Sequence, residues 1–170
     1  MAHLIEPLEM RDQLYDFLSN HAMLTEIATW SKSLLDVVPD EADSAGKAFP
    51  VAAVTWHYEW NAMETSPIYV GGTDRRRLLL WVCISCKASI ADGESDVTST
   101  DQAVRLANLV ELVLRSNDGR ALSYGGNTAA QGVATPEMRI RVARKDTDLK
   151  KWYSTVYIRV EITNIRGQIS

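Results

Sequence analysis

The longest alternating stretch of the chain is residues 77–90, RLLLWVCISCKASI. Successive side chains of a β-strand point to opposite faces of the sheet. One face of this stretch is wholly apolar and consists of Leu78, Leu80, Val82, Ile84, Cys86 and Ala88. The other face is mixed and carries Arg77, Leu79, Trp81, Cys83, Ser85 and Lys87. This pattern predicts a long strand in an antiparallel sheet that is covered on one side.

Further segments alternate with the same period of two. Residues 51–60 place Ala52, Val54, Trp56, Tyr58 and Trp60 on one face. Residues 138–143 and 152–162 are predicted to pair as an antiparallel hairpin at the end of the sheet. Residues 68–70 are a candidate for one more short strand. The sheet should therefore contain four to five strands.

Two segments have apolar residues at helical spacing. In residues 5–30, Ser19 and Asn20 fall in the middle, so both one helix and two helices fit the pattern. The second segment begins at Ser99, where Ser99 and Gln102 have capping-box spacing, and ends at Asn117. Its broad apolar stripe should pack against the sheet.

The chain is predicted to be a single domain, residues 1–170. It would comprise an N-terminal helical region (residues 1–38), an acidic loop (39–48) and an α+β core (49–165). Residues 123–135, rich in Gly, Ala, Asn and Thr, are expected to form a loop. The predicted fold class is α+β, an antiparallel or mixed sheet with helices packed on one face.

Composition and charge exclude several classes of function. With 18 Lys and Arg against 22 Asp and Glu, the net charge is −4, which disfavours a dedicated nucleic-acid-binding protein. No apolar run approaches the roughly 20 residues that span a bilayer, so no membrane partner is expected. The first residues do not resemble a signal peptide, and we expect the chain to stay in the compartment where it is made.

The sequence contains no recognisable catalytic or metal-binding constellation. Cys83 and Cys86 form a C-x-x-C within the predicted strand, where they would point to opposite faces and could neither bridge nor chelate together. There is no nucleophile elbow and no phosphate-binding loop. His57 is interpreted as structural or surface-exposed. We therefore predict a protein that is not an enzyme and has no catalytic residue, metal or cofactor.

Two groups of residues are candidates for a protein interface. The first is the basic cluster Arg75, Arg76 and Arg77, which is either solvated charge at a strand edge or a contact to an acidic neighbouring subunit or DNA phosphate. The second group is aromatic and lies on the face opposite the apolar core: Trp81, Tyr153 and Tyr157. Such aromatics often mark a subunit interface, although a helix packed on that face would also explain them.

The layout of the chain resembles the tail terminator (minor tail or neck) proteins of long-tailed bacteriophages. An N-terminal helix is followed by Phe49-Pro50-Val51, which opens a strand, and by the strand RLLLWV at residues 77–82. Asp101-Gln102-Ala103 lies at the start of a helix, and the last strand reads STVYIRVEI at residues 154–162. The resemblance covers residues 49–165 and rests on the order of these elements.

The resemblance implies a structural virion subunit without a cofactor. Such subunits form a ring, commonly a hexamer, that caps the tail tube, ends its polymerisation and joins the tail to the head. The implied partners are other copies of the chain, the tail tube protein and a head–tail connector or neck protein. Genomic DNA would pass through the lumen without specific binding. The implied location is the tail or neck of the virion, with host cytoplasm during assembly.

Other functions remain open from the sequence. Within the same class, the chain could be another head–tail joining or neck protein. In a different class, it could be a small ligand-binding module that uses a pocket between the second helix and the sheet, or an enzyme with an unrecognised site. A ring of about six copies favours the terminator, and a stable monomer with a ligand cavity favours the module.

Overall fold

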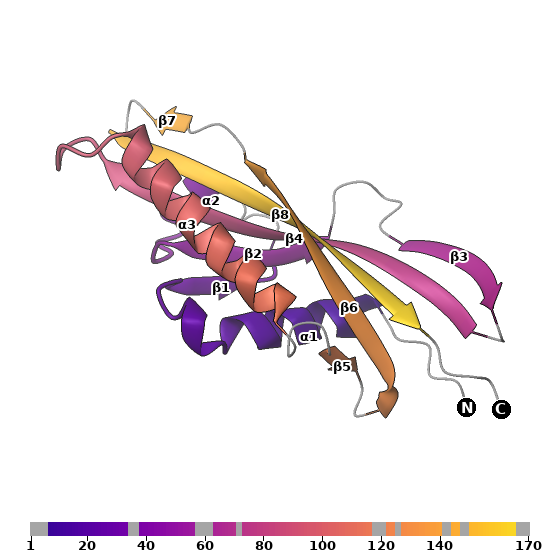
Figure 1. Cartoon of the computed structure of the whole chain (residues 1–170). Coiled ribbons are helices and arrows are strands. Elements are labelled where there is room, and N and C mark those ends of the chain that lie inside the picture. The colour runs from indigo at the N-terminus through magenta and orange to yellow at the C-terminus, as the bar shows by residue number, and fades with distance from the viewer. Residues whose placement is uncertain are drawn as a thin grey trace.

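The structure is a computed structural model that describes the backbone of residues 7–33, 38–56, 63–70, 73–116, 122–124, 127–140, 144–146 and 150–165. Side chains are described for residues 11–33, 38–55, 80–116 and 150–160. The elements in chain order (Figure 1) are α1 (Pro7–Ser19), the 3-10 turn η1 (Ala22–Leu24), β1 (Thr29–Ser31), α2 (Pro39–Ser44), β2 (Val51–Trp56), β3 (Met63–Val70), β4 (Thr73–Ser89), α3 (Asp96–Arg115), β5 (Leu122–Tyr124), β6 (Asn127–Ile140), β7 (Arg144–Asp146) and β8 (Lys151–Ile165).

The strands form one mixed sheet in the order β1-β2-β4-β8-β6-β5, with β3 paired to β4 and β7 paired to β8. The pairing of β1 with β2 is parallel, and the other pairings are antiparallel. The predicted α+β class is therefore confirmed. Of the described strands, β2, β3, β4, β6 and β8 are long, whereas β1, β5 and β7 have three residues each.

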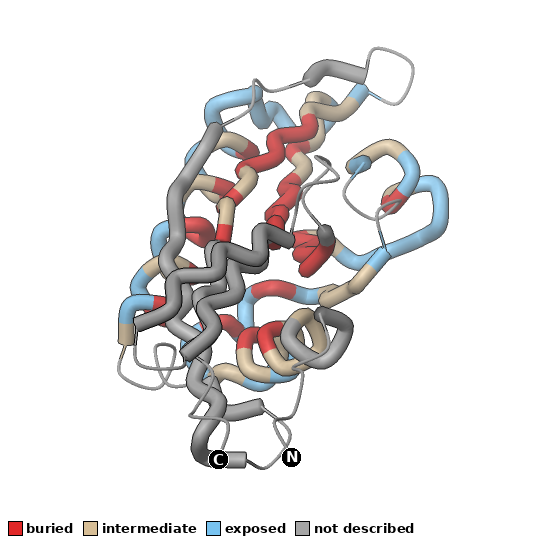
Figure 2. The backbone as a smooth tube through the Cα atoms, turned by 90° about the vertical axis from the view of Figure 1, so that its right-hand side faces the viewer, coloured by how far each residue is buried: buried red, intermediate tan, exposed pale blue. Residues whose placement is uncertain are grey.

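The main core lies between the sheet and the helices α1 and α3. As predicted, the apolar positions of β4 from Leu80 to Ala88 all face this core, and β8 contributes the matching row. Each fully buried Leu, Ile or Val contributes about 1.5–3 kcal/mol of hydrophobic stabilisation. Figure 2 shows the buried residues on the inward sides of the helices and along the strands between them. The fully buried members include Leu14, Leu18, Leu80, Ile84, Leu106, Leu114 and Ile158.

Helix α1 touches both ends of the sheet. It packs against β1 and β2 at one end and against β5 at the other. The sheet therefore curves around α1 and α3, which share its concave side (Figure 1).

Four local predictions are wrong. The N-terminal region is not helical throughout: α1 is followed by one 3-10 turn and then by β1, which pairs in parallel with β2. The acidic stretch of residues 39–48 is not all loop. It contains α2, because Pro39 suits a first helical position, two acidic residues lie in the first turn and Ala42 is buried.

The start of α3 is the third correction. The helix begins at Asp96, one turn before the predicted Ser99, and the N–H of Ser95 donates to Oγ1 of Thr98 at 3.4 Å. Ser99 lies inside the helix, where its hydroxyl is 2.8 Å from that of Ser154 on β8. Ser99 is fully buried, so it joins the helix to the sheet and does not cap it.

The described residues of the stretch 123–135 are also not a loop. They contribute the end of β5 and much of β6, which pairs with β8 from Gly132↔Asn164 to Ile140↔Val156. The C-x-x-C prediction is confirmed in its geometry, because both cysteines lie on β4 and both are buried. Cys86 belongs to the core under the helices, and Cys83 points to the opposite face.

The long strands continue past the helical layer. β4 has 17 residues and spans about 55 Å, whereas the 20 residues of α3 span about 30 Å. Figure 1 shows β4, β8 and β3 running beyond the C-terminal end of α3. We call this part of the sheet the arm: β3, residues 73–79 of β4 and residues 161–165 of β8.

Candidate functional site

The predicted interface aromatics, Trp81, Tyr153 and Tyr157, belong to the face of β4 and β8 that points away from α3, which we call the outer face. In the described part of the sheet most of this face is covered, contrary to the prediction. Cys83, Ser85 and Thr155 on it are buried, and the hydroxyls of Ser85 and Thr155 are 3.0 Å apart. The sheet is therefore buried on both faces here.

Helix α2 lies on the outer face and is fixed there by Asp43. The Asp43 carboxylate accepts hydrogen bonds from Nζ of Lys151 at 2.7 Å, from the hydroxyl of Tyr153 at 2.6 Å and from Nζ of Lys87 at 3.0 Å. The Asp43 side chain is only 10% exposed. We call these four residues the Asp43 cluster.

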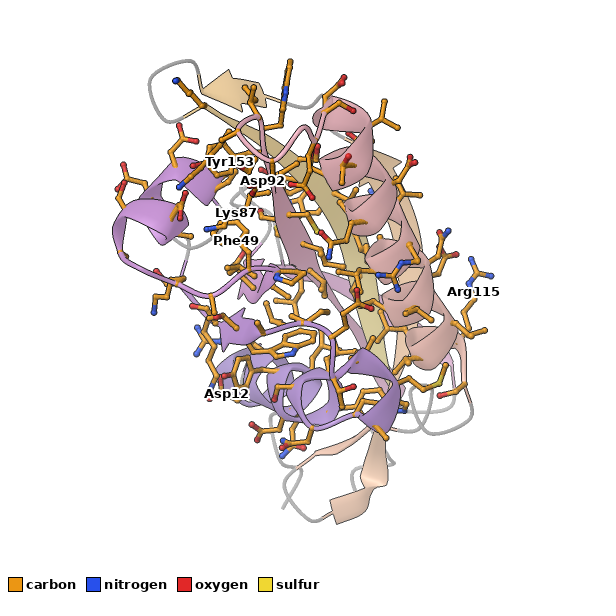
Figure 3. All side chains as sticks on the ribbon, turned by 90° about the vertical axis from the view of Figure 1, so that its left-hand side faces the viewer. Asp12, Phe49, Lys87, Asp92, Arg115 and Tyr153 are labelled. Carbon is orange, nitrogen blue, oxygen red and sulfur yellow. The ribbon has the colours of Figure 1, made fainter. Side chains whose placement is uncertain are left out.

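An aromatic ring completes the cluster. Nζ of Lys87 lies 4.9 Å from the centre of the Phe49 ring, and the rings of Phe49 and Tyr153 are 6.2 Å apart. Figure 3 shows Phe49, Lys87 and Tyr153 together beside α2, on the other side of the sheet from α3. The cation contributes about 0.5–1 kcal/mol through its contact with the ring.

The electrostatics identify the cluster as a structural clamp. Burial by itself raises the pKa of Asp43, but the hydrogen bonds from Lys151, Tyr153 and Lys87 outweigh it and hold the pKa far below the ordinary 3.8. A carboxylate with so low a pKa is a poor proton acceptor at neutral pH, so Asp43 is not suited to general-base catalysis. Its chemistry here is to hold α2 against the sheet.

The aromatics of the outer face are more buried than predicted. Tyr153 is 1% exposed and Trp81 is 7% exposed, and only Tyr157 is half-buried. For Tyr153 the alternative explanation, a helix packed on this face, applies, because α2 and Phe49 cover it. The rings of Trp81 and Tyr157 meet edge to face, with their centres 5.5 Å apart. Both contacts are within the chain, and a role of these residues in an interface stays a prediction.

The basic cluster Arg75–Arg77 lies in the arm. These residues are inside β4, between β3 and β8, and not at the start of the strand. Their register partners are Ser66 to Glu64 on β3 and Ile165 to Thr163 on β8. Their side chains lie outside the described residues, and so does His57.

The six predicted residues therefore occupy three places along β4 and β8. Arg75–Arg77 are in the arm, Trp81 and Tyr157 are in the middle, and Tyr153 is under α2. About ten strand residues, or roughly 34 Å, separate Arg77 from Lys87. The Asp43 cluster was missed by the sequence prediction. In the sequence it is marked only by Asp43 in the polar stretch of residues 39–48 and by Lys150 and Lys151 before the last predicted strand.

The space between α3 and the sheet, where a ligand pocket was one alternative, is filled by the buried side chains of the core. A shallow hollow of about 490 Å³ lies instead on the outward side of α3, beside Val104, Asn108 and Leu112. In the described ranges, no three His, Cys, Asp or Glu side chains gather as metal ligands would. None of the helices described above is long and apolar enough to cross a bilayer.

Comparison with known proteins finds similarity among solved structures. No family model matches the chain, and no curated protein matches it either. Among solved structures, a chain from the virion of a native gene transfer agent particle has a TM-score of 0.48 and 12% sequence identity, over 94% of this chain and 96% of that chain. That protein is part of a virion. At this identity and TM-score, the similarity assigns no family to the present chain.

Proposed function

We propose that this chain is a structural subunit of a phage-like particle that forms a ring on the end of the tail tube. In this role it ends tube polymerisation and joins the tail to the head or neck, without catalysis. The sequence resemblance to tail terminator proteins supports this role. The ring would act in the tail or neck of the virion, after assembly in the host cytoplasm.

The observation that carries the proposal is the arm. The strands of the arm leave the helical layer, and β3 lies at its edge, paired with β4. An edge strand can pair with a strand of another chain. The arm also holds three consecutive arginines in a chain whose net charge is −4. An arm on one side of a subunit that contacts a different surface of the next copy is a heterologous contact, and such contacts build a ring when the rotation from copy to copy closes on itself.

The partners follow from this arrangement. The Arg75–Arg77 segment would contact an acidic surface, either on the neighbouring copy or on the tube protein. The overall negative charge would favour a lumen through which DNA slides without being held.

The proposal can be tested with the full chain and a charge-neutral variant of the arm, R75Q/R76Q/R77Q. Light scattering coupled to size-exclusion chromatography gives the mass with and without the tail tube protein. We expect about six times the chain mass of 19.0 kDa for the wild type on tube ends, and loss of this assembly in the variant.

A control variant removes positive charge outside the arm. K47Q/K150Q replaces two exposed lysines and should assemble like the wild type. A wild-type chain that stays at 19.0 kDa alone and with the tube protein would contradict the proposal. Equal assembly of the arm variant and the wild type would contradict the role assigned to the arginines.

A further inference from the structure

The outward side of α3 carries apolar side chains that are exposed on the surface. Val97 and Leu112 are 58% and 57% exposed, the two most exposed of the large hydrophobic side chains that the structure describes. Both belong to one row of the helix, together with Asp101, Val104, Asn108 and Arg115, because residues three, four and seven apart share a face. The shallow hollow of about 490 Å³ lies along the same row.

The row is symmetric about Asn108 in both spacing and chemistry. Val104 and Leu112 stand four residues before and after it, and Asp101 and Arg115 stand seven residues before and after it. The order is thus acid, apolar, amide, apolar, base. A pattern of this kind is complementary to a copy of itself that runs in the opposite direction.

We infer that two copies of this chain pack α3 against α3 in antiparallel orientation, around a two-fold axis near Asn108. In this arrangement Asp101 faces Arg115 of the second copy, and Val104 faces Leu112 of the second copy. The two Asn108 amides meet at the axis, where each can donate and accept a hydrogen bond. The contact is isologous, so every pair occurs twice.

The contacts within the chain are compatible with this pairing. Arg115 already binds Glu111 at 2.6 Å, one turn away on the same helix. Its guanidinium has five N–H donors, so it can keep Glu111 and still donate to Asp101 of the second copy. Arg105, at the flank of the row, is held by Glu26 and does not compete for Asp101.

The size of the row predicts a reversible dimer. From Asp101 to Arg115 the helix extends about 21 Å, so one helix face provides less than the roughly 800 Å² per partner of a standard interface. Pairing should therefore depend on protein concentration. Because an isologous contact is complete with two copies, it builds no ring. It is independent of the arm and goes beyond the proposed function.

The test is the mass of the full chain by sedimentation velocity over a concentration series, with D101R, R115D and the double variant D101R/R115D. Each single variant places like charges opposite each other at two symmetry-related positions. We expect the dissociation constant of the dimer to rise about tenfold. The double variant restores both pairs with reversed sign, and its dissociation constant should return to within about threefold of the wild-type value.

Two further variants complete the test. L112D should abolish the dimer, whereas M23D alters a similarly exposed apolar residue on η1 and should leave it intact. Circular dichroism checks that each variant is folded. A wild-type chain that is monomeric at every concentration would overturn the inference. A double variant that dimerises no better than the single variants would also overturn the inference. Neither outcome depends on whether rings form on tube ends.

Discussion

The Asp43 cluster gives the sharpest prediction on stability. Asp43→Ala removes the acceptor of three hydrogen bonds that join α2 to β4 and β8. The Tyr153 hydroxyl is then left buried without this acceptor, which costs about 1–3 kcal/mol. The two lysines are each about a third exposed and can turn to water, so each loses only about 0–1 kcal/mol.

These contributions predict a loss of about 1–5 kcal/mol in the free energy of unfolding. For a chain of this length, that corresponds to a fall in the thermal midpoint of about 2–20 °C. The matched control is Glu41→Ala, which removes the same charge from an exposed position of α2 and should cost less than about 0.5 kcal/mol.

Urea unfolding followed by circular dichroism measures both variants. A double-mutant cycle with Tyr153→Phe isolates the hydroxyl contact: Tyr153→Phe should cost about 1–2 kcal/mol less in the Asp43→Ala background than in the wild type. If Asp43→Ala and Glu41→Ala unfold at the same urea concentration, α2 is not held by this carboxylate and our reasoning on the outer face is refuted.

Three further predictions concern pH, thiols and packing. The folded-state pKa of Asp43 is lowered from 3.8, so the stability that its carboxylate contributes is present above that pH and is lost progressively below it. Urea unfolding should therefore give a constant difference in stability between wild type and Asp43→Asn near neutral pH. This difference should narrow as the pH falls through 3.8. Burial raises the pKa of Cys86 to about 12, so a thiol reagent at pH 8 should label it only after unfolding, and labelling of the folded chain would refute this. Leu106→Ala on the buried side of α3 should cost about 2–5 kcal/mol in thermal unfolding, but Leu112→Ala under about 0.5 kcal/mol, and equal costs would contradict the assigned faces.

Strong periodicity made the main strands and the long helix predictable. The alternation in β2, β4 and β8 marks the core face correctly, because each strand is long enough to show a period of two. β1 has three residues and α2 has six, so neither is long enough to show a reliable pattern. Their formation depends on tertiary contacts: β1 pairs with β2, and Asp43 holds α2.

Strand β6 shows why local composition can mislead. Gly132 and Pro136 are typical of loops, yet they pair with Asn164 and Val160 of β8. A strand between two partners is stabilised by those partners, and its own residues need not have high strand propensity.

The outer-face site was predictable only in part. Alternation correctly placed Trp81, Tyr153 and Tyr157 opposite the helical core. It could not show what covers them, because Asp43 and Tyr153 are 110 residues apart in the chain. The aromatics therefore indicated an exposed face where the structure has a packed one. This shifts the expected contact with neighbours toward the arm.

The central claim, that the chain ends the growth of a tail tube, is tested most directly by the lengths of tubes assembled in its presence. Purified tube protein is polymerised with increasing amounts of the full chain, and tube lengths are measured by electron microscopy. We predict shorter tubes with extra density at one end, and R75Q/R76Q/R77Q should have a weaker effect. A length distribution that does not change at any amount of the wild-type chain would contradict the claim.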